Sequence, residues 1–118
     1  MIKIGPGGTA GLGYEDGLKE IKKLGLSALE VEFTHSVHMK NETAKVVGEL
    51  AKKNKIDLSV HAPYFINLAS KEKPKIKASI QRILNSCEKA HYLGATHVVY
   101  HSGFFKDREP KGLLAYEA

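Results

Sequence analysis

The 118-residue sequence predicts an α/β fold of the (β/α) barrel type, with about four βα units and therefore a partial or half barrel. Short β-rich runs alternate with amphipathic stretches, which indicates parallel strands joined by right-handed crossovers. Two of these runs end in a histidine, and ligand-binding groups gather at strand C-termini in barrels. A complete barrel needs roughly 250 residues, so four strands make about half of one.

The first unit is expected to contain a strand at 2–5 and a helix at 15–25. Gly25 is placed to end this helix, because glycine readily adopts the left-handed conformation of a helix C-terminus. The apolar face of the helix is made by Leu18, Ile21 and Leu24.

The second unit is expected to contain a strand at 28–33 and a helix at 41–54. The strand alternates apolar and polar residues, as a half-buried strand does. Asn41 is a candidate N-terminal cap for the helix. The apolar residues of the helix are Val46, Val47, Leu50 and Ala51.

A strand at 57–62 and a helix from Pro74 to Gly94 form the third unit. Proline favours the first turn of a helix and glycine its end. A fourth strand is expected at 96–101, and a fourth helix near Pro110. The third helix has apolar or weakly polar residues at helical spacing, namely Ile76, Ile80, Ile83, Leu84, Cys87 and His91.

A doubly wound sheet is the competing architecture. It normally has a glycine-rich phosphate-binding turn that leads directly into the first helix. The stretch "GPGGTAGLG" at 5–13 matches neither GxGxxG nor GxxxxGK[ST], and several residues separate it from the apolar face of the first helix. A flexible turn is favoured there over a loop that contacts a ligand, and the barrel is favoured over the doubly wound sheet.

The composition fits one globular unit, with 42% hydrophobic and 26% charged residues. No apolar run reaches the length of a membrane span, and the N-terminus lacks the apolar region of a signal peptide. The single cysteine, Cys87, excludes an internal disulfide and a cysteine-based zinc site. We therefore expect a cytoplasmic protein in a reducing compartment.

The formal net charge is +5, and only two of the 18 basic residues, Arg82 and Arg108, are arginines. A basic balance is compatible with an anionic partner such as nucleic acid. Most lysines, however, fall on the expected solvent faces of helices, and base-edge recognition favours arginine. Charge alone therefore favours ordinary solvated surfaces.

His61 and His101 end neighbouring strands in equivalent positions, with their side chains expected to face the barrel axis. Two imidazoles brought together there can bind a transition metal, and zinc is the most frequent metal with nitrogen ligands. Each ring also needs an acceptor that fixes its tautomer, and the candidates are Glu32 or a backbone carbonyl. A single histidine at a strand end is more often structural, whereas a pair favours a metal site.

Aromatic residues follow both histidines. Tyr64 and Phe65 follow His61, and Phe104 and Phe105 follow His101. Such side chains can stack on bases or wedge into a duplex, but packing over the barrel mouth is the better interpretation for all except Tyr64. Among the remaining histidines, His35 and His38 are expected to be solvated loop residues, and His91 to be a core or helix-end residue.

The stretch "VHAPYFINLAS" at 60–70, with "HSG" after the next strand, resembles the N-terminal half of the endonuclease IV family. These proteins are zinc-dependent apurinic/apyrimidinic (AP) endonucleases with a xylose isomerase-like TIM barrel. The run His-x-x-Tyr-hydrophobic-Ile-Asn-Leu carries the resemblance, at His61, Tyr64, Ile66, Asn67 and Leu68. The resemblance implies that residues 1–118 are the N-terminal part of a single TIM-barrel domain.

The resemblance also implies roles for individual residues. His61 and His101 would be zinc ligands of a multinuclear cluster. Tyr64 would lie in a DNA-recognition loop that distorts double-stranded DNA at an abasic site, and Asn67 would support that loop. The implied reaction is hydrolysis of the phosphodiester 5′ to an abasic site in base excision repair. The catalytic carboxylates belong to later strands, so no catalytic residue is assigned in this chain.

Two other functions remain open. One is a metal-dependent sugar isomerase or epimerase of the same superfamily, and the other is a non-catalytic half-barrel fragment that binds DNA or a partner subunit. With only two histidine ligands, the chain alone is expected to bind zinc weakly and to show little or no catalysis. Its first and fourth strands would be unpaired edges, so it is expected to self-associate through the open barrel edges.

Overall fold

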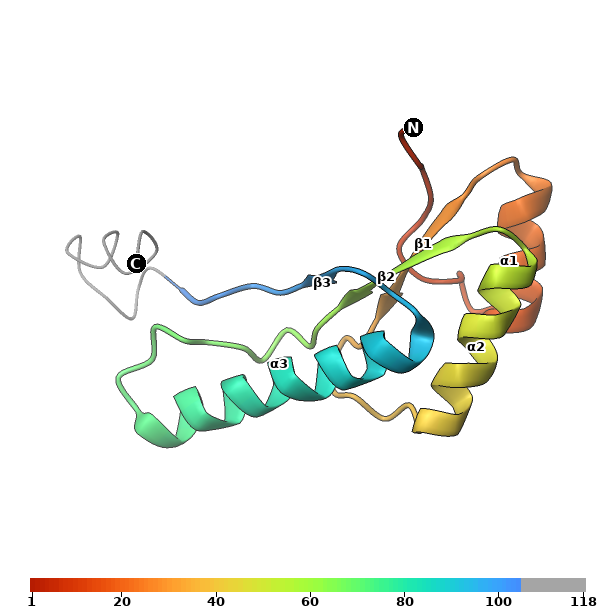
Figure 1. Ribbon diagram of the computed structural model, residues 1–118. Coiled ribbons are helices and arrows are strands. Elements are labelled where there is room, and N and C mark those ends of the chain that lie inside the picture. Colours follow the sequence, from red (N-terminus) through yellow and green to blue (C-terminus); the bar gives the residue numbers. More distant parts are fainter. Residues whose placement is uncertain (105–118) are drawn as a thin grey trace.

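The computed structural model describes residues 1–104 and shows a parallel sheet with three helices on one of its faces (Figure 1). The strands are ordered β1-β2-β3, and both pairings are parallel. This is part of a (β/α) barrel, as the sequence predicts. The elements in chain order are α1 (Gly13–Lys23), β1 (Ala28–Glu32), α2 (Asn41–Lys53), β2 (Asp57–His61), α3 (Lys73–Leu93) and β3 (Val98–Val99).

The strand register brings the C-terminal ends of the strands to one edge of the sheet. Glu32, the last residue of β1, lies opposite His61, the last residue of β2. His61 in turn lies opposite Val99 at the end of β3. His101 follows two residues later, so both predicted histidines reach the same edge.

Alternation along the strands separates an apolar face from a polar one. Leu29 and Val31 on β1 are each 1% exposed, and Val60 on β2 is fully buried. Their neighbours in the chain, such as Glu30 and Ser59, are only half-buried and face the other side of the sheet. Burying one such aliphatic side chain stabilises the fold by about 1.5–3 kcal/mol. The core therefore lies between the sheet and the helices, and the opposite face of the sheet stays polar.

The expected strand at 2–5 does not form. Instead, the segment 4–8 runs beside β1 and makes three backbone hydrogen bonds at 2.9–3.0 Å, two with Glu30 of β1 and one with Ser27 just before it. The assigned ladder there is a single parallel bridge between Gly7 and Glu30. Pro6 has no N–H to donate, so a regular ladder cannot continue through this segment.

Helix α1 begins two residues earlier than expected and ends at Lys23, and Gly25 follows in the left-handed conformation with φ +75°. Leu18 and Ile21 are buried as predicted. The prediction for Leu24 is wrong, since this residue is 64% exposed. Leu24 is the capping residue after the last helical turn, so it lies outside the face that packs on the sheet.

Helix α2 differs from the prediction at its start. Lys40 occupies the capping position, and Asn41 is the first helical residue. The Asn41 amide donates to Glu88 on α3 at 3.1 Å, and its oxygen accepts from Lys89. Hydrogen bonds from Asn41 and Lys89 lower the pKa of the Glu88 carboxyl. Asn41 thus connects two helices instead of capping one.

The buried face of α2 also differs in part from the predicted one. Val47 and Ala51 are buried and Leu50 is half-buried, but Val46 is 59% exposed. Close contact with α3 occurs at Gly48, where a Cβ would lie 2.7 Å from the Leu93 carbonyl oxygen.

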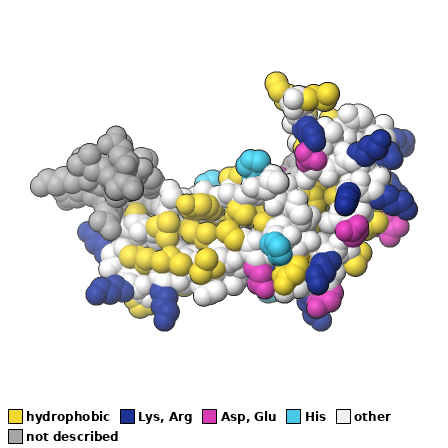
Figure 2. Space-filling model, viewed as in Figure 1, with side chains coloured by type: hydrophobic (Ala, Val, Ile, Leu, Met, Phe, Trp, Pro, Cys, Tyr) yellow, Lys and Arg dark blue, Asp and Glu magenta, His cyan; other side chains and the backbone are white. Residues whose placement is uncertain are grey.

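Helix α3 buries a different face from the predicted one. Its buried residues are Ser79, Ser86, Ala90 and Leu93. Of the predicted apolar face, Ile76 and Ile83 are half-buried, whereas the exposed members are Ile80, Leu84, Cys87 and His91. The small side chains of the buried face let α3 lie close to the sheet and to α2. The apolar side chains of the other face stay at the surface, and Figure 2 shows a broad hydrophobic surface along this part of the molecule. Gly94 ends the helix in the left-handed conformation, as predicted.

The fourth strand is shorter than expected, with only Val98 and Val99 in the ladder. The expected helix near Pro110 lies outside the described residues, as does Phe105. In the part of the chain that the structure describes, no helix is long and apolar enough to cross a membrane.

Candidate functional site

The two histidines predicted to form a pair lie together at the C-terminal edge of the sheet. The ring centroids of His61 and His101 are 5.1 Å apart, and the ring planes are inclined by 47°. His61 is half-buried and His101 is exposed. The pair therefore opens to the end of the barrel where ligands gather in this architecture.

A backbone carbonyl fixes the tautomer of His61. Its Nδ1 lies 2.8 Å from the carbonyl oxygen of Ala62. A carbonyl oxygen only accepts, so Nδ1 carries the proton and Nε2 of the neutral ring keeps its lone pair. This is the orientation in which a histidine binds a metal through Nε2.

Glu32 also lies at this edge, opposite His61 in the strand register. Its carboxylate lies against the N-terminal segment, where a Cβ on Gly7 would be 2.5 Å from Oε1. Of the two acceptors considered for Nδ1 of His61, the backbone carbonyl makes the bond. That Glu32 helps to orient the metal ligands, without binding the metal itself, stays a prediction.

The donor chemistry of the pair suits zinc. Imidazole nitrogens are common zinc ligands, and a hydrogen bond to the second ring nitrogen orients such a ligand. Within residues 1–104, no group of three or more His, Cys, Asp or Glu side chains could hold a metal ion. The described residues thus offer two ligands, and further ligands would have to come from elsewhere.

Tyr64 borders both histidines. Its ring centroid is 6.1 Å from that of His61 and 6.5 Å from that of His101, and the residue is 49% exposed. His35, in the loop after β1, contacts Tyr64 edge-on at 6.4 Å and stacks on Phe65 at 6.0 Å. His35 is an exposed loop residue, as expected, but no pattern in the sequence indicates that it joins these rings.

The loop between β2 and α3, residues 62–72, carries Tyr64 and is called the Tyr64 loop. Backbone hydrogen bonds connect it to its surroundings. The Tyr64 N–H donates to the carbonyl of Thr34 at 3.0 Å, which connects it to the loop after β1. The Leu68 N–H donates to the carbonyl of Ser102 at 2.8 Å, one residue after His101. The Tyr64 loop and the His101 segment are therefore held together.

Side chains of α3 also form hydrogen bonds with the backbone of this loop. Ser79, which is 2% exposed, accepts a hydrogen bond from the Asn67 N–H at 2.9 Å and donates to the Lys75 carbonyl at 2.8 Å. Arg82 donates from Nη1 to the carbonyl of Phe65 at 3.0 Å. Asn67 also closes a local turn, because its Oδ1 accepts from the Ala69 N–H at 3.1 Å. Sequence reasoning missed Ser79 and Arg82, since nothing local links them to the loop.

We predict that Ser79→Ala loosens the Tyr64 loop. The substitution removes the hydroxyl that bonds Asn67, and the loss of such a buried bond costs about 1–3 kcal/mol. Ser86→Ala is the matched control, because Ser86 is fully buried on the same helix and donates to the Arg82 carbonyl in the same i−4 pattern, without a bond to the loop. Hydrogen exchange of the loop amides should rise in Ser79→Ala alone, and equal rises in both variants would contradict this role.

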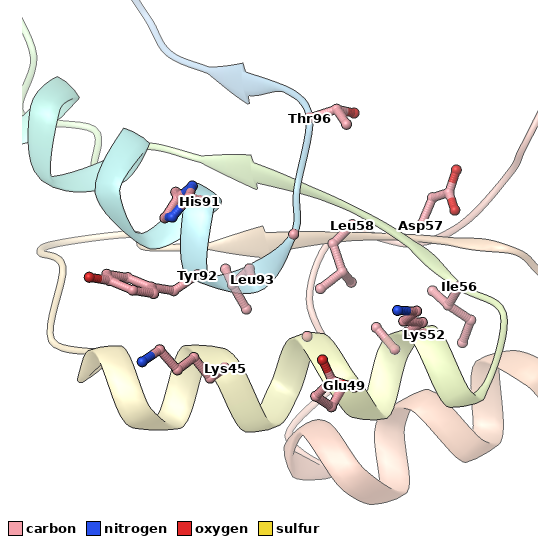
Figure 3. Close-up of a pocket in the computed structure, with 13 residues that line it drawn as sticks. Lys45, Glu49, Lys52, Ile56, Asp57, Leu58, His91, Tyr92, Leu93 and Thr96 are labelled. Carbon is pink, nitrogen blue, oxygen red and sulfur yellow. The ribbon is translucent and has the colours of Figure 1, made fainter.

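His38, His91 and a pocket beside His91 lie away from the pair. His38 is exposed and bonds the hydroxyl of Ser36. His91 lies at the end of α3, which confirms its expected place at a helix end, although it is exposed and not part of the core. It lines a pocket of about 480 Å³ between α2, α3 and the N-terminal ends of β2 and β3 (Figure 3). That pocket is at the opposite edge of the sheet from His61.

Comparison with known proteins identifies related sequences. Residues 18–118 match a family model described as xylose isomerase-like TIM barrel. An uncharacterised protein of Methanocaldococcus jannaschii is 37% identical over 106 residues, which cover 86% of this chain and 38% of the relative. A probable endonuclease 4 of Metamycoplasma arthritidis is 37% identical over 54 residues, which cover 46% of this chain and 19% of the relative. The chain thus spans less than two fifths of either relative.

Solved structures share the fold. A D-tagatose 3-epimerase-like protein superposes with a TM-score of 0.72 at 23% identity, over 87% of this chain and 39% of that one. Endonuclease IV from Thermus thermophilus gives a TM-score of 0.64 at 23% identity, over 86% of this chain and 40% of that one. These similarities establish the architecture, which the epimerase-like protein and endonuclease IV share.

Proposed function

The chain belongs to the xylose isomerase-like TIM barrel family, and we propose that it forms the N-terminal part of the single barrel domain of a zinc-dependent AP endonuclease. The proposed reaction is hydrolysis of the phosphodiester 5′ to an abasic site in double-stranded DNA, during base excision repair in the cytoplasm. The observation that carries the proposal is the position of Tyr64, half-exposed and within 6.5 Å of both histidine rings.

Sequence similarity favours the nuclease over other members of the family. The 54-residue match to a probable endonuclease 4 is at 37% identity. The run from His61 to Leu68, which carries the resemblance to endonuclease IV, forms the C-terminal end of β2 and the Tyr64 loop. The residues of the resemblance thus coincide with the residues at the candidate site.

We assign zinc-ligand roles to His61 and His101. His61 presents Nε2 because the Ala62 carbonyl holds Nδ1, and His101 lies beside it. Zinc bound there would activate a water molecule for attack and stabilise negative charge on the phosphate. Glu32, at the same edge, is assigned the role of a residue that orients the metal ligands without binding the metal itself.

Tyr64 and Asn67 are assigned to DNA recognition. An exposed ring beside the metal ligands can wedge into a duplex where a base is missing, and an unpaired nucleotide costs less to extrude than a paired one. Asn67 keeps the loop in shape through its bonds to Ala69 and Ser79. The net charge of +5 supplies affinity for the DNA backbone that should weaken with salt.

The proposal is tested by nicking of an end-labelled duplex that carries one abasic site. The protein expressed from its complete reading frame, supplied with zinc, should cut the strand 5′ to the site and leave an intact control duplex uncut. The sugar-enzyme alternative is tested on the same preparation with ketoses and a divalent metal. Folded, zinc-loaded protein that epimerises a ketose and leaves the abasic strand intact would overturn the nuclease proposal.

A further inference from the structure

Arg82 lies in the middle of α3, and of the two arginines in the sequence it is the one within residues 1–104. The residue is half-buried. Its Nη1 donates to the carbonyl of Phe65 at 3.0 Å, and its side chain forms no ion pair with any residue between 1 and 104. A hydrogen bond from a charged donor is stronger than one from a neutral donor. The guanidinium group therefore binds the backbone of the Tyr64 loop and not a carboxylate.

Three consecutive residues of the Tyr64 loop are fixed to the body of the protein. The Phe65 carbonyl accepts from Arg82, and the next side chain, Ile66, is fully buried. The N–H that follows, that of Asn67, donates to a hydroxyl group on α3 at 2.9 Å. Of the two side chains of α3 that bond this backbone, Arg82 is thus the one closer to Tyr64 in the chain.

The ring of Tyr64 depends on this backbone for its direction. It is 49% exposed, and its centroid lies 6.1 and 6.5 Å from those of His61 and His101. Within residues 1–104, its hydroxyl group forms no hydrogen bond. Release of the Phe65 carbonyl would free the backbone one residue away from Tyr64, and the ring would then be free to turn away from the two imidazoles.

We propose that Arg82 is a positioning residue, which fixes the direction of the Tyr64 ring over the histidine pair through its bond to the Phe65 carbonyl. The direction of the ring is a property of the protein alone, whereas the effect of Arg82 on nicking rests on the proposed function. Residues that contact a ligand need such support, because a displacement of about 1 Å can lower a rate roughly 100-fold.

Three substitutions separate the donor from the bulk of the side chain. Arg82→Met keeps an unbranched apolar stem, which still packs, and removes the donor. Arg82→Lys restores a cationic donor. Gln81→Ala is the control, because Gln81 is exposed on the same helix and its side chain donates to Asn85 on α3. Circular dichroism checks that each variant is folded.

The first test measures the position of the ring. In zinc-free protein with isotope-labelled histidines, the Hε1 resonances of His61 and His101 report the ring current of Tyr64, and Tyr64→Ala gives its size. Arg82→Met should move both resonances by at least half of that amount, and Arg82→Lys should return them toward wild type. Gln81→Ala should leave them in place. Wild-type resonances in Arg82→Met, or equal shifts in Arg82→Met and Arg82→Lys, would overturn the proposal.

The second test measures whether Arg82 acts through Tyr64. In the protein expressed from its complete reading frame, Arg82→Met should lower kcat/KM for nicking at an abasic site about tenfold, as the loss of one hydrogen bond to a charged group does. In a Tyr64→Ala background, the same substitution should cause no further loss, because residues that act through one contact are not additive. Losses that multiply would overturn the proposal, since Arg82 would then act independently of Tyr64.

The positioning role and the proposed function fail separately. Nicking by wild type, with histidine resonances that do not respond to Arg82→Met, overturns the positioning role and leaves the proposed nuclease intact. Resonances that respond as predicted, in a wild-type protein that does not nick, support the positioning role and overturn the nuclease.

Discussion

His101→Ala, in the protein expressed from its complete reading frame, is expected to lower the rate of nicking at an abasic site by at least about 100-fold. The reason is the loss of a direct metal ligand, since even outer partners of such ligands contribute about 10–100-fold to metal affinity or activity. The loss should appear both in the zinc content per chain, measured by atomic absorption, and in the initial rate of nicking.

His91→Ala is the matched control for this experiment. His91 is exposed at the far end of α3, beside the pocket at the opposite edge of the sheet. It should keep the zinc content and nicking rate of wild type. A His101→Ala protein that nicks as fast as the His91→Ala control would contradict the assignment of His101 as a ligand.

Leu18→Ala is expected to lower the free energy of unfolding by about 2–5 kcal/mol, the cost of removing a large side chain from a packed core. Leu18 is fully buried in the cluster between α1 and the sheet. A loss of this size is comparable with the whole stability of many small domains. Urea denaturation followed by circular dichroism measures it.

Leu24→Ala makes the same chemical change further along the chain. Leu24 is 64% exposed after the end of α1, so its replacement should change the free energy of unfolding by no more than about 0.5 kcal/mol. The sequence alone predicts that both leucines are core residues. Equal destabilisation by the two substitutions would therefore favour the sequence prediction over the structure.

Short-range patterns in the sequence predict the position of most helices and strands. The alternation at 28–33 and 57–62 corresponds to β1 and β2, and the glycines at 25 and 94 follow α1 and α3 in the left-handed conformation, as predicted. These features depend on residues close together in the chain. The strand expected at 2–5 depends on pairing with β1, and Pro6 prevents a regular ladder there.

Helical spacing could not identify the buried face of α3. Ile80 and Leu84 form an apolar stripe in the sequence, yet they are 47% and 56% exposed. The face that packs inward contains Ser79 and Ser86, whose hydroxyls bond back to the helix and can therefore be buried. Which face turns inward depends on close approach to neighbouring elements, and a hydrophobicity pattern does not carry that information.

The candidate site was predictable only in part. The ends of neighbouring parallel strands meet at one edge of the sheet, which brings His61 and His101 together, although His61 pairs with Val99 and His101 lies two residues beyond it. The contacts that shape the Tyr64 loop come from residues distant in the chain, such as Arg82 and His35. No spacing rule connects these residues to the loop, so they required the structure.

The central claim is that the His61–His101 pair binds zinc, because the nuclease assignment depends on it. The most direct measurement is anomalous diffraction at the zinc edge, from crystals of the complete protein grown with zinc. We predict an anomalous peak between the two imidazoles, on the Nε2 side of His61. Crystals with fully ordered histidines and zinc bound only elsewhere would contradict the claim.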